Sequence, residues 1–464
     1  MERSLRQIDA NVHWTQEVGL DVVGHTITRS RIEIVLAGLD VGELRVRKLT
    51  MVMTVLFCIA MNLFTEEAME AVMSKLVAAP RFLRPVNDLD AAGASAICQR
   101  RKQLGVAPMV ALYKEVCHPM ATSQTRDAFL FGLRLMAVDG TVENVADTPA
   151  NSRYFGRHIG SRGESAFPQM RCVYLCECGT HAICDAGAWP YGVDERVGGL
   201  RMLRSVGPGI LMLWDCGFHS YDMADRCFRQ QKAHFLGRVP AFVVFQPVRS
   251  LPDGSYLAYI RPSGYRRRKA GECLLVRVIE YTIDDPGRPG HGERHRLITS
   301  LLEPDLYPAR DLALAYHERW EVELTIDETD THQRRPYHPF RSRTPLGVLQ
   351  EFYGLLLAHY AIRSIMHESA LQADVAPDRL SFVNSVRIIR AALFQAQIVA
   401  PSQSADWHRR LLQDIGRELL PQRANRSNPR VVKRKMSNFD LKRDVHRHWP
   451  QPTKPFADAI VLLI

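Results

Sequence analysis

The sequence predicts a multidomain α/β protein, and three observations lead to this expectation. The chain has 464 residues, about three times the ~150 residues of a typical domain, so several domains are expected. Its apolar periodicity changes along the chain from helical to alternating and back to helical. Two apolar strands are each followed by an aspartate, Asp139 and Asp215, and a later helix carries Glu323 on a polar face.

The charge balance indicates a polyanionic partner. Lys and Arg number 60 against 50 Asp and Glu, a formal net charge of +10, which favours nucleic acid and leaves an acidic membrane surface as the alternative. The longest apolar run, 49–64, is shorter than the ~18 residues of a membrane span, so we expect a buried helix. The N-terminus resembles no secretory signal, and we therefore expect a cytosolic protein with free thiols.

Residues 1–130 are expected to form a helical domain. The apolar run is followed by TEEAMEAVMSKL, which Thr65 can cap, and then by SAICQRRKQLG. This last segment places Arg100, Arg101 and Lys102 beside an apolar stripe. It predicts either a helix that is presented to DNA or a solvated helix face, and the sequence leaves both open.

The first alternating segments follow this helical part. The strand in LRLMAVDGT ends at Asp139, and the strand in GPGILMLWDCGFHS delivers Asp215. Ligands of open α/β sheets bind at the carboxyl ends of the strands, so the two carboxylates are expected at one edge of a sheet. A single aspartate after a strand is usually a turn or cap residue, but a pair is a stronger indication of a site.

A cysteine-rich segment lies between these two strands. Five possible zinc ligands occur within thirteen residues: Cys172, Cys176, Cys178, His181 and Cys184. Their spacing matches no paired CxxC ribbon, and alternate residues fall on one face of a strand before a turn at Gly179. We therefore expect a hairpin with buried thiols, and a structural zinc site is the alternative.

Residues 235–305 read as mostly β and contain a cluster with one aromatic and four basic side chains. These are Tyr265, Arg266, Arg267, Arg268 and Lys269. Consecutive cations beside an aromatic ring suit phosphate contact with base stacking, and a solvated hairpin tip is the alternative.

The helical pattern then returns, with a polar stripe along one face. Tyr316, Arg319, Glu323 and Asp330 stand at i, i+3, i+7 and i+14, which places them on the same side of a helix. Farther on, residues 417–447 hold ten Lys or Arg against three acids. We expect a DNA-contacting tail there, with a disordered solubilising tail as the alternative.

In this order, the segments resemble the DDE transposases of the insertion-sequence-four family, which are relatives of the transposase of transposon five. The resemblance rests on motifs that span most of the chain. They are VDGT at 138–141, DTPAN at 147–151, LWDCGFHS at 213–220, YHERWEVE at 316–323, RSRTPLGV at 341–348, LLLAHYAIR at 355–363 and NPRVVKRKM at 428–436.

The resemblance implies a fold. A ribonuclease H-like catalytic core would comprise residues 131–234 and 306–370, and the mostly β segment 235–305 would be an insertion between its two parts. Residues 1–130 would be a helical DNA-binding domain, and residues 371–464 a helical C-terminal region with a basic tail that includes Lys433, Arg434 and Lys435.

The resemblance also implies an activity, namely cut-and-paste DNA transposition through cleavage and strand transfer at the ends of the element. Asp139, Asp215 and Glu323 would be catalytic and would hold two Mg²⁺ ions, with Mn²⁺ as a substitute, because hard cations prefer carboxylate oxygens. Arg319 would contact a DNA phosphate and Tyr316 the DNA backbone. The partners would be double-stranded DNA, at element ends and target, and a second copy in a synaptic homodimer. The location would be the bacterial cytosol, at the nucleoid.

Three departures from the family pattern qualify this expectation. Asp330 stands where the family signature has Lys, and Cys216 stands where relatives commonly have Arg. The insertion has no tryptophan to hold a flipped base, which leaves Tyr265 as a substitute. Because two departures remove positive charge near the expected DNA contact, the alternative is a degenerate copy, impaired by Asp330, that binds DNA without cleaving it.

Overall fold

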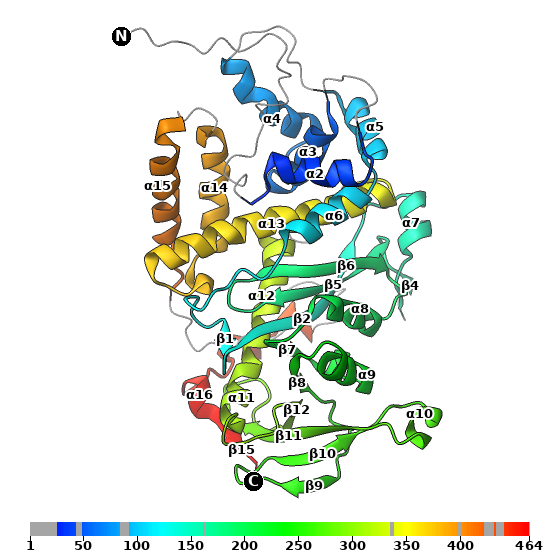
Figure 1. Cartoon of the computed structure of the whole chain (residues 1–464), viewed down its shortest axis with the longest axis vertical. Coiled ribbons are helices and arrows are strands. Elements are labelled where there is room, and N and C mark those ends of the chain that lie inside the picture. Colours follow the sequence, from blue (N-terminus) through cyan, green and yellow to red (C-terminus); the bar gives the residue numbers. More distant parts are fainter. Residues whose placement is uncertain are drawn as a thin grey trace.

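The computed structural model describes residues 26–42, 49–83, 92–160, 163–334, 338–396, 401–421, 431–432 and 440–463. A mixed sheet of eleven strands lies at its centre, and helices from the N-terminal and C-terminal parts lie together at one end of the molecule (Figure 1). The chain is therefore a mixed α/β protein with a helical N-terminal region.

Five helices make up the described N-terminal part: α2 (Arg29–Gly38), α3 (Met51–Leu63), α4 (Met69–Leu83), α5 (Ala94–Leu104) and α6 (Ala107–Val116). The predicted buried helix is confirmed, since all residues of α3 except Val52 are buried and the Thr50 hydroxyl caps its first turn. No helix of the described residues has the length and apolarity needed to span a bilayer.

The structure shows which basic residues of α5 are buried and bonded and which are exposed. Arg101 is buried and donates to the side chains of Gln350 and Ser342, and Arg100 donates to the carbonyl of Leu49. These two guanidinium groups therefore tie α5 to its neighbours, whereas Lys102 is exposed. Neither of the two readings from the sequence describes Arg100 and Arg101, because both readings placed them on an outer face.

The first part of the sheet has the order β6–β5–β2–β7–β8. Strands β2, β5 and β6 are antiparallel neighbours, whereas β7 and β8 run parallel to β2. The pairing of β5 with β6 confirms the predicted hairpin, whose four cysteines are buried. The bounds are β1 (Phe129–Leu130), β2 (Leu133–Asn144), β5 (Gln169–Glu177), β6 (Ala182–Pro190), β7 (Ile210–Trp214) and β8 (His234–Arg238).

The predicted β segment continues the same sheet, because β12 pairs with β8 and the order runs on as β12–β11–β10–β9. A strand from the C-terminus, β15, pairs with the far part of β11. The predicted domain boundaries stay predictions, and β8 crosses the one at 234/235. The bounds are β9 (Pro247–Ser250), β10 (Tyr256–Ile260), β11 (Leu274–Ile283), β12 (His295–Thr299) and β15 (Ile460–Leu462).

The longest helix, α13 (Pro345–Ala373), lies between the N-terminal helices and the sheet (Figure 1) and contacts α3, α6, α15 and β6. Most of its side chains are buried, so it forms the centre of the hydrophobic core between the helices and the sheet. The other helices are α7 (Pro149–Phe155), α8 (Glu195–Met202), α9 (Tyr221–Asp225), α10 (Tyr265–Lys269), α11 (Ala309–Ala315), α12 (Trp320–Asp327), α14 (Phe382–Ala396), α15 (Ser404–Gly416) and α16 (Phe456–Ala459). Short strands complete the described elements: β3 (Ile159–Gly160), β4 (Gly163–Glu164), β13 (Val431–Val432) and β14 (Asp440–Leu441).

Candidate active site

Asp139 lies inside β2, and the expectation that it ends its strand is wrong. The pairing of β2 with β7 stops at Ala137 and Leu213, but its pairing with β5 continues as far as Asn144. The sheet therefore opens between β2 and β7 beside Asp139. Asp215 follows the last residue of β7 and accepts a hydrogen bond from the amide of Gly217 (2.8 Å).

The register of the two parallel strands brings the aspartates together. Asp139 comes two residues after Ala137 and Asp215 two residues after Leu213, and these are the last paired residues. Equivalent positions on adjacent parallel strands are neighbours. The negative charge of Asp215 accordingly contributes to the raised pKa of Asp139.

Gly140, the residue after Asp139, allows another acid to approach closely. A Cβ atom on Gly140 would lie 2.1 Å from Oε1 of Glu195, at the start of α8. Burial, opposed by Arg171 and reinforced by Asp215, raises the pKa of Glu195. The site thus has a fourth carboxylate, Glu195, that was not expected from the sequence, because Glu195 reaches Gly140 through the packing of α8 on the sheet.

Arg319 joins the strand aspartate to the helical glutamate. Its Nη1 donates to Oδ2 of Asp139 (3.0 Å), and its Nη2 donates to Oε1 of Glu323 (2.7 Å), one turn farther along. The Arg319 side chain is 13% exposed, against 17% for Asp139 and 33% for Glu323. The helix is tightened into a 3₁₀ turn over Tyr316–Arg319, directly before α12. Three predicted site residues are therefore in direct contact.

Burial dominates the electrostatics of Asp139. It raises the pKa of this carboxyl to about 6, although the guanidinium of Arg319 and the amide of Gly140 both act to lower it. An ionised carboxylate at this place therefore needs a nearby cation. Burial likewise raises the pKa of Tyr316, which is 6% exposed, so its hydroxyl remains protonated.

A cavity of about 810 Å³ opens beside Asp215, Arg319 and Glu323. Its walls come from β8, β11, β12, the helix with the signature residues, and α16 at the C-terminus. Positive and aromatic side chains dominate the lining: Arg238, Arg288, Arg319, Tyr281, Tyr316, Trp320 and Phe456. This composition suits phosphate groups and base or sugar faces.

Two residues of this cavity bear on departures from the family pattern. Arg238 lines it together with Cys216, and although burial raises the pKa of the Cys216 thiol, the charge of Arg238 acts to lower it. A cation from β8 is therefore present beside Cys216. Trp320, 46% exposed, also lines the cavity, whereas Tyr265 is not among the lining residues.

Asp330 has a different environment from the one expected for a DNA-facing residue. The helix widens into a π turn over Glu328–Gln333, which shifts the register of the predicted polar stripe. Asp330 approaches Arg334 (3.9 Å), which also pairs with Glu143 on β2 (2.8 Å). Burial and the Glu143 carboxylate raise the pKa of Asp330. The acid is thus engaged with a cation and a second acid on β2.

A buried polar network holds α12 in place. Glu328 accepts hydrogen bonds from Arg363 and His359 on α13, and it also pairs with His181 in the β5–β6 turn. The other ring nitrogen of His181 contacts Glu321 (2.8 Å), two residues before Glu323. This network links the helix that carries Glu323 to both α13 and the sheet.

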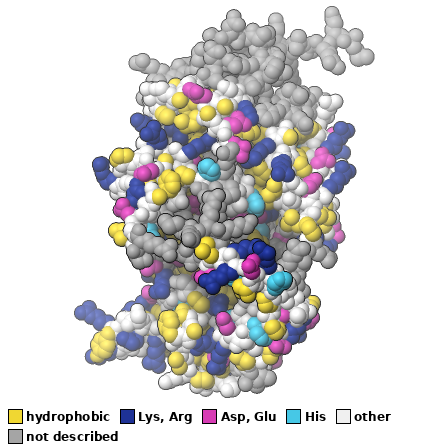
Figure 2. All heavy atoms as spheres, turned by 180° about the vertical axis from the view of Figure 1, so that it is seen from behind, with side chains coloured by type: hydrophobic (Ala, Val, Ile, Leu, Met, Phe, Trp, Pro, Cys, Tyr) yellow, Lys and Arg dark blue, Asp and Glu magenta, His cyan; other side chains and the backbone are white. Residues whose placement is uncertain are grey.

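The predicted basic cluster forms α10, at the tip of an arm that projects from the sheet (Figure 1). Figure 2 shows Lys and Arg side chains gathered on this arm. Tyr265 is 71% exposed, and Arg266, Arg268 and Lys269 are exposed as well. Arg267 differs, because it pairs with Asp222 and Glu272. The tail residues Lys433, Arg434 and Lys435 lie outside the described residues.

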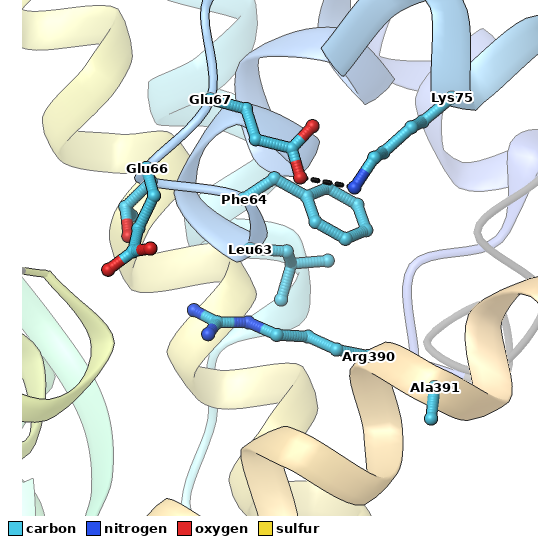
Figure 3. Close-up of a pocket in the computed structure, with 8 residues that line it drawn as sticks. Leu63, Phe64, Glu66, Glu67, Lys75, Arg390 and Ala391 are labelled. Atoms are coloured by element: carbon cyan, nitrogen blue, oxygen red, sulfur yellow. Dashed lines mark hydrogen bonds and ion pairs between the residues drawn. The ribbon is translucent and has the colours of Figure 1, made fainter. Parts of the chain in front are cut away.

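A second cavity, of about 340 Å³, lies between α3, α4 and α14 (Figure 3). Arg390 extends from α14 below Leu63, and Lys75 pairs with Glu67 on the other side. Glu66 also lines it. Two acids and two cations balance there, so this cavity lacks the positive character of the first one.

The donor chemistry of the candidate active site fits a hard divalent cation, since Asp139, Asp215 and Glu323 supply only carboxylate oxygens. In the described parts of the chain, however, no three Asp, Glu, His or Cys side chains are placed to hold one metal ion. The guanidinium of Arg319 lies between two of the three carboxylates. In this arrangement, Arg319 is the cation that pairs with Asp139 and Glu323.

Comparison with known proteins gives matches over most of the chain. Residues 18–114 match the family described as insertion element 4 transposase N-terminal, and residues 130–361 match the transposase DDE domain. The transposase InsG for insertion sequence element IS4, from Escherichia coli strain K12, is 25% identical over 417 residues, which are 89% of each chain. A piggyBac transposase synaptic complex with hairpin DNA covers 87% of this chain and 86% of its own at 13% identity and a TM-score of 0.42, a similarity too low to carry an argument.

Proposed function

This chain belongs to the DDE transposases of the insertion-sequence-four family, and from that membership we propose that Asp139, Asp215 and Glu323 are its catalytic carboxylates. The protein is a polynucleotidyl transferase that catalyses DNA transposition. The proposal concerns how it does so, namely by metal-dependent cleavage and strand transfer at the ends of its element. The ribonuclease H-like character of the core, with the strand order β6–β5–β2–β7–β8, belongs to the same proposal.

One observation carries the proposal. Carboxylates from a strand, from the end of the adjacent parallel strand and from a helix meet beside a cavity lined by Arg238, Arg288 and Arg319. Phosphodiester chemistry needs such oxygens for cations and such guanidinium groups for phosphates. The carboxylates are separated by up to nearly 200 residues in the sequence, yet the fold brings them together. A chance cluster of surface charges would not need such distant residues to converge.

The residues of the chain have distinct roles in this proposal. Asp139, Asp215 and Glu323 would hold two Mg²⁺ or Mn²⁺ ions, which supply Lewis acidity for the attack on a phosphodiester. Arg238 and Arg319 bind phosphate oxygens through charged hydrogen bonds. Trp320 offers its exposed ring to a base, which is the role that the sequence suggested for Tyr265.

The wider interface follows from the exposed cations. Tyr265, Arg266, Arg268 and Lys269 on α10 contact the backbone of double-stranded DNA at a distance from the cavity, and the basic C-terminal segment adds to this contact. Two element ends must be joined in one reaction, so we propose that a homodimer forms on the DNA. Excision by the cut-and-paste route is part of the same proposal.

The test is cleavage of a labelled duplex that carries the end of the element. We expect Asp139→Asn, Asp215→Asn and Glu323→Gln each to lower the Mg²⁺-dependent cleavage rate by about 10³-fold or more, with DNA still bound. Asp327→Asn is the matched control, because Asp327 lies on the same helix α12 and is 50% exposed. Cleavage that survives in the three variants would refute the assignment. DNA binding by the unaltered chain without any cleavage would support the degenerate copy instead.

A further inference from the structure

The contact between Arg319 and the two carboxylates has a consequence for metal binding. We propose that Arg319 occupies the place of the metal charge in the free enzyme and must leave before a divalent cation can bind. Metal loading and DNA binding would then be coupled through this one side chain, which either neutralises Asp139 and Glu323 or binds a phosphate. This inference rests on the proposed function of the carboxylates.

The first support is that the relevant oxygens are already engaged. Asp139 accepts from the amide of Gly140 through Oδ1 (2.8 Å) and from Arg319 through Oδ2 (3.0 Å). Oε1 of Glu323 accepts a hydrogen bond from the same guanidinium (2.7 Å). A divalent cation bound to these oxygens would lie next to a guanidinium that cannot lose its charge. The two cations therefore exclude each other by position and by repulsion.

The second support is that the buried carboxylates need some cation at all times. Asp139 and Arg319 are 17% and 13% exposed, so water screens their charges poorly. A site built only from acids would be unstable before the metal arrives. Arg319 compensates this charge within the chain itself, and its position one helical turn from Glu323 allows the exchange by side-chain rotation alone.

The third support is that the guanidinium of Arg319 could bind a DNA phosphate in the adjacent cavity instead of the carboxylates. Arg319 and Glu323 both line the cavity that Arg238 also lines, so an incoming phosphate would meet Arg319 there. Transfer of the guanidinium to the phosphate frees both carboxylates at the moment when DNA is present. The free enzyme would then bind metal weakly and the DNA complex would bind it tightly.

The test measures Mn²⁺ binding, without DNA, by electron paramagnetic resonance. We expect Arg319→Ala and the shorter, polar but neutral Arg319→Gln to bind Mn²⁺ about tenfold more tightly than the unaltered chain, although both bind DNA more weakly. Arg238→Ala is the matched control. It removes the same charge from the same cavity, but Arg238 donates to His295 and, within the described part of the chain, makes no hydrogen bond or ion pair with the three carboxylates. Its affinity for Mn²⁺ should change by less than about threefold.

A second arm adds a duplex with the element end. The DNA should tighten Mn²⁺ binding of the unaltered chain several-fold, and this gain should be smaller in Arg319→Gln. Thermal melting by circular dichroism verifies that each variant is folded. Equal Mn²⁺ affinity of the Arg319 variants and the unaltered chain would overturn the inference and leave the proposed function intact. Mn²⁺ binding that survives in Asp139→Asn/Glu323→Gln would instead overturn the proposed function.

Discussion

At the scale of single residues, Asp139 shows how the site is balanced between burial and charge pairing. Burial raises the pKa of this carboxyl to about 6, even with Arg319 bonded to it. The ionised form at neutral pH is therefore less favourable in the folded than in the unfolded chain. The proposed metal-binding role requires the carboxylate, so the fold carries a local cost that a neutral side chain would remove.

Asp139→Asn should therefore stabilise the protein at neutral pH. The folded pKa exceeds the unfolded value of 3.8, so the folded state binds more protons between about pH 4 and 6, and stability falls as the pH rises through that window. We expect the variant to be more stable by about 1–3 kcal/mol at pH 7.5 and by almost nothing at pH 4. Urea unfolding at both values measures the difference. The exposed Asp406→Asn serves as control, and a loss of stability of Asp139→Asn at pH 7.5 would contradict this account.

The sequence allowed part of the site to be predicted. The helical spacing of Arg319 and Glu323 survives as a contact in the fold, and the two aspartates come from neighbouring parallel strands, although only Asp215 follows its strand and Asp139 lies inside β2. Asp330 could not be placed in the same way, because a π turn alters the helical period on which the prediction depended. Arg238 and Glu195 come from elements whose approach to the site is decided by tertiary packing, so no local pattern indicates them.

At the scale of elements, the C-terminal segment completes the sheet through β15 and the cavity through Phe456 of α16. Strand β15 pairs with β11, and the preceding α16 places Phe456 against His317, with ring centroids 3.7 Å apart. The segment before α16 is held by Asp285, whose carboxylate accepts hydrogen bonds from the amide and the hydroxyl of Thr453. One wall of the cavity thus depends on a segment close to the C-terminus.

Asp285→Ala should loosen this C-terminal segment without unfolding the sheet. The fully buried carboxylate accepts hydrogen bonds from Thr453 and Gly287, and its loss leaves these donors without a partner in a buried place. We expect hydrogen exchange of the peptide that contains β15 to become at least about tenfold faster. The neighbouring Asp284→Ala is the control, since Asp284 is 62% exposed and its carboxylate pairs with the side chain of Lys454. Equal exchange in the two variants would argue against Asp285 as the anchor.

Elements with a strong local pattern were predictable, and elements made by distant pairing were not. The apolar composition of α3 indicates burial directly, and alternation around Gly179 indicates the β5–β6 hairpin. The short β15 has too few residues to predict a strand. It exists because β11 offers an open edge, which only the assembled sheet reveals.

At the scale of the whole molecule, the positive side chains divide into structural and exposed groups. Arg100, Arg101 and Arg267 bind partners within the protein. Arg266, Arg268 and Lys269 remain exposed on the projecting α10. The net charge alone indicated a polyanionic partner, but only the fold separates the cations that can reach DNA from those that hold the chain together.

The double variant Arg266→Gln/Arg268→Gln should weaken DNA binding and reduce its salt dependence. Each phosphate contact that is lost should lower the slope of log K against log salt by about 0.9. Arg267→Gln is the matched comparison, because Arg267 already pairs with Asp222 (2.6 Å) and Glu272 (2.8 Å). It should leave the slope almost unchanged. Fluorescence anisotropy with duplex DNA between 50 and 200 mM salt, about the range over which such slopes are read, measures all three proteins. An unchanged slope in the double variant would remove α10 from the DNA interface.

The central claim is that the carboxylates beside the cavity hold the catalytic metal, and a change of metal preference tests it most directly. Asp215→Cys replaces a hard oxygen donor with a softer sulfur donor, which Mn²⁺ accepts more readily than Mg²⁺. We expect this variant to bind the element end, to fail to cleave it with Mg²⁺ and to regain cleavage with Mn²⁺. Cleavage with Mg²⁺ at the rate of the unaltered enzyme, or no recovery with Mn²⁺ in the folded and DNA-bound variant, would contradict the claim.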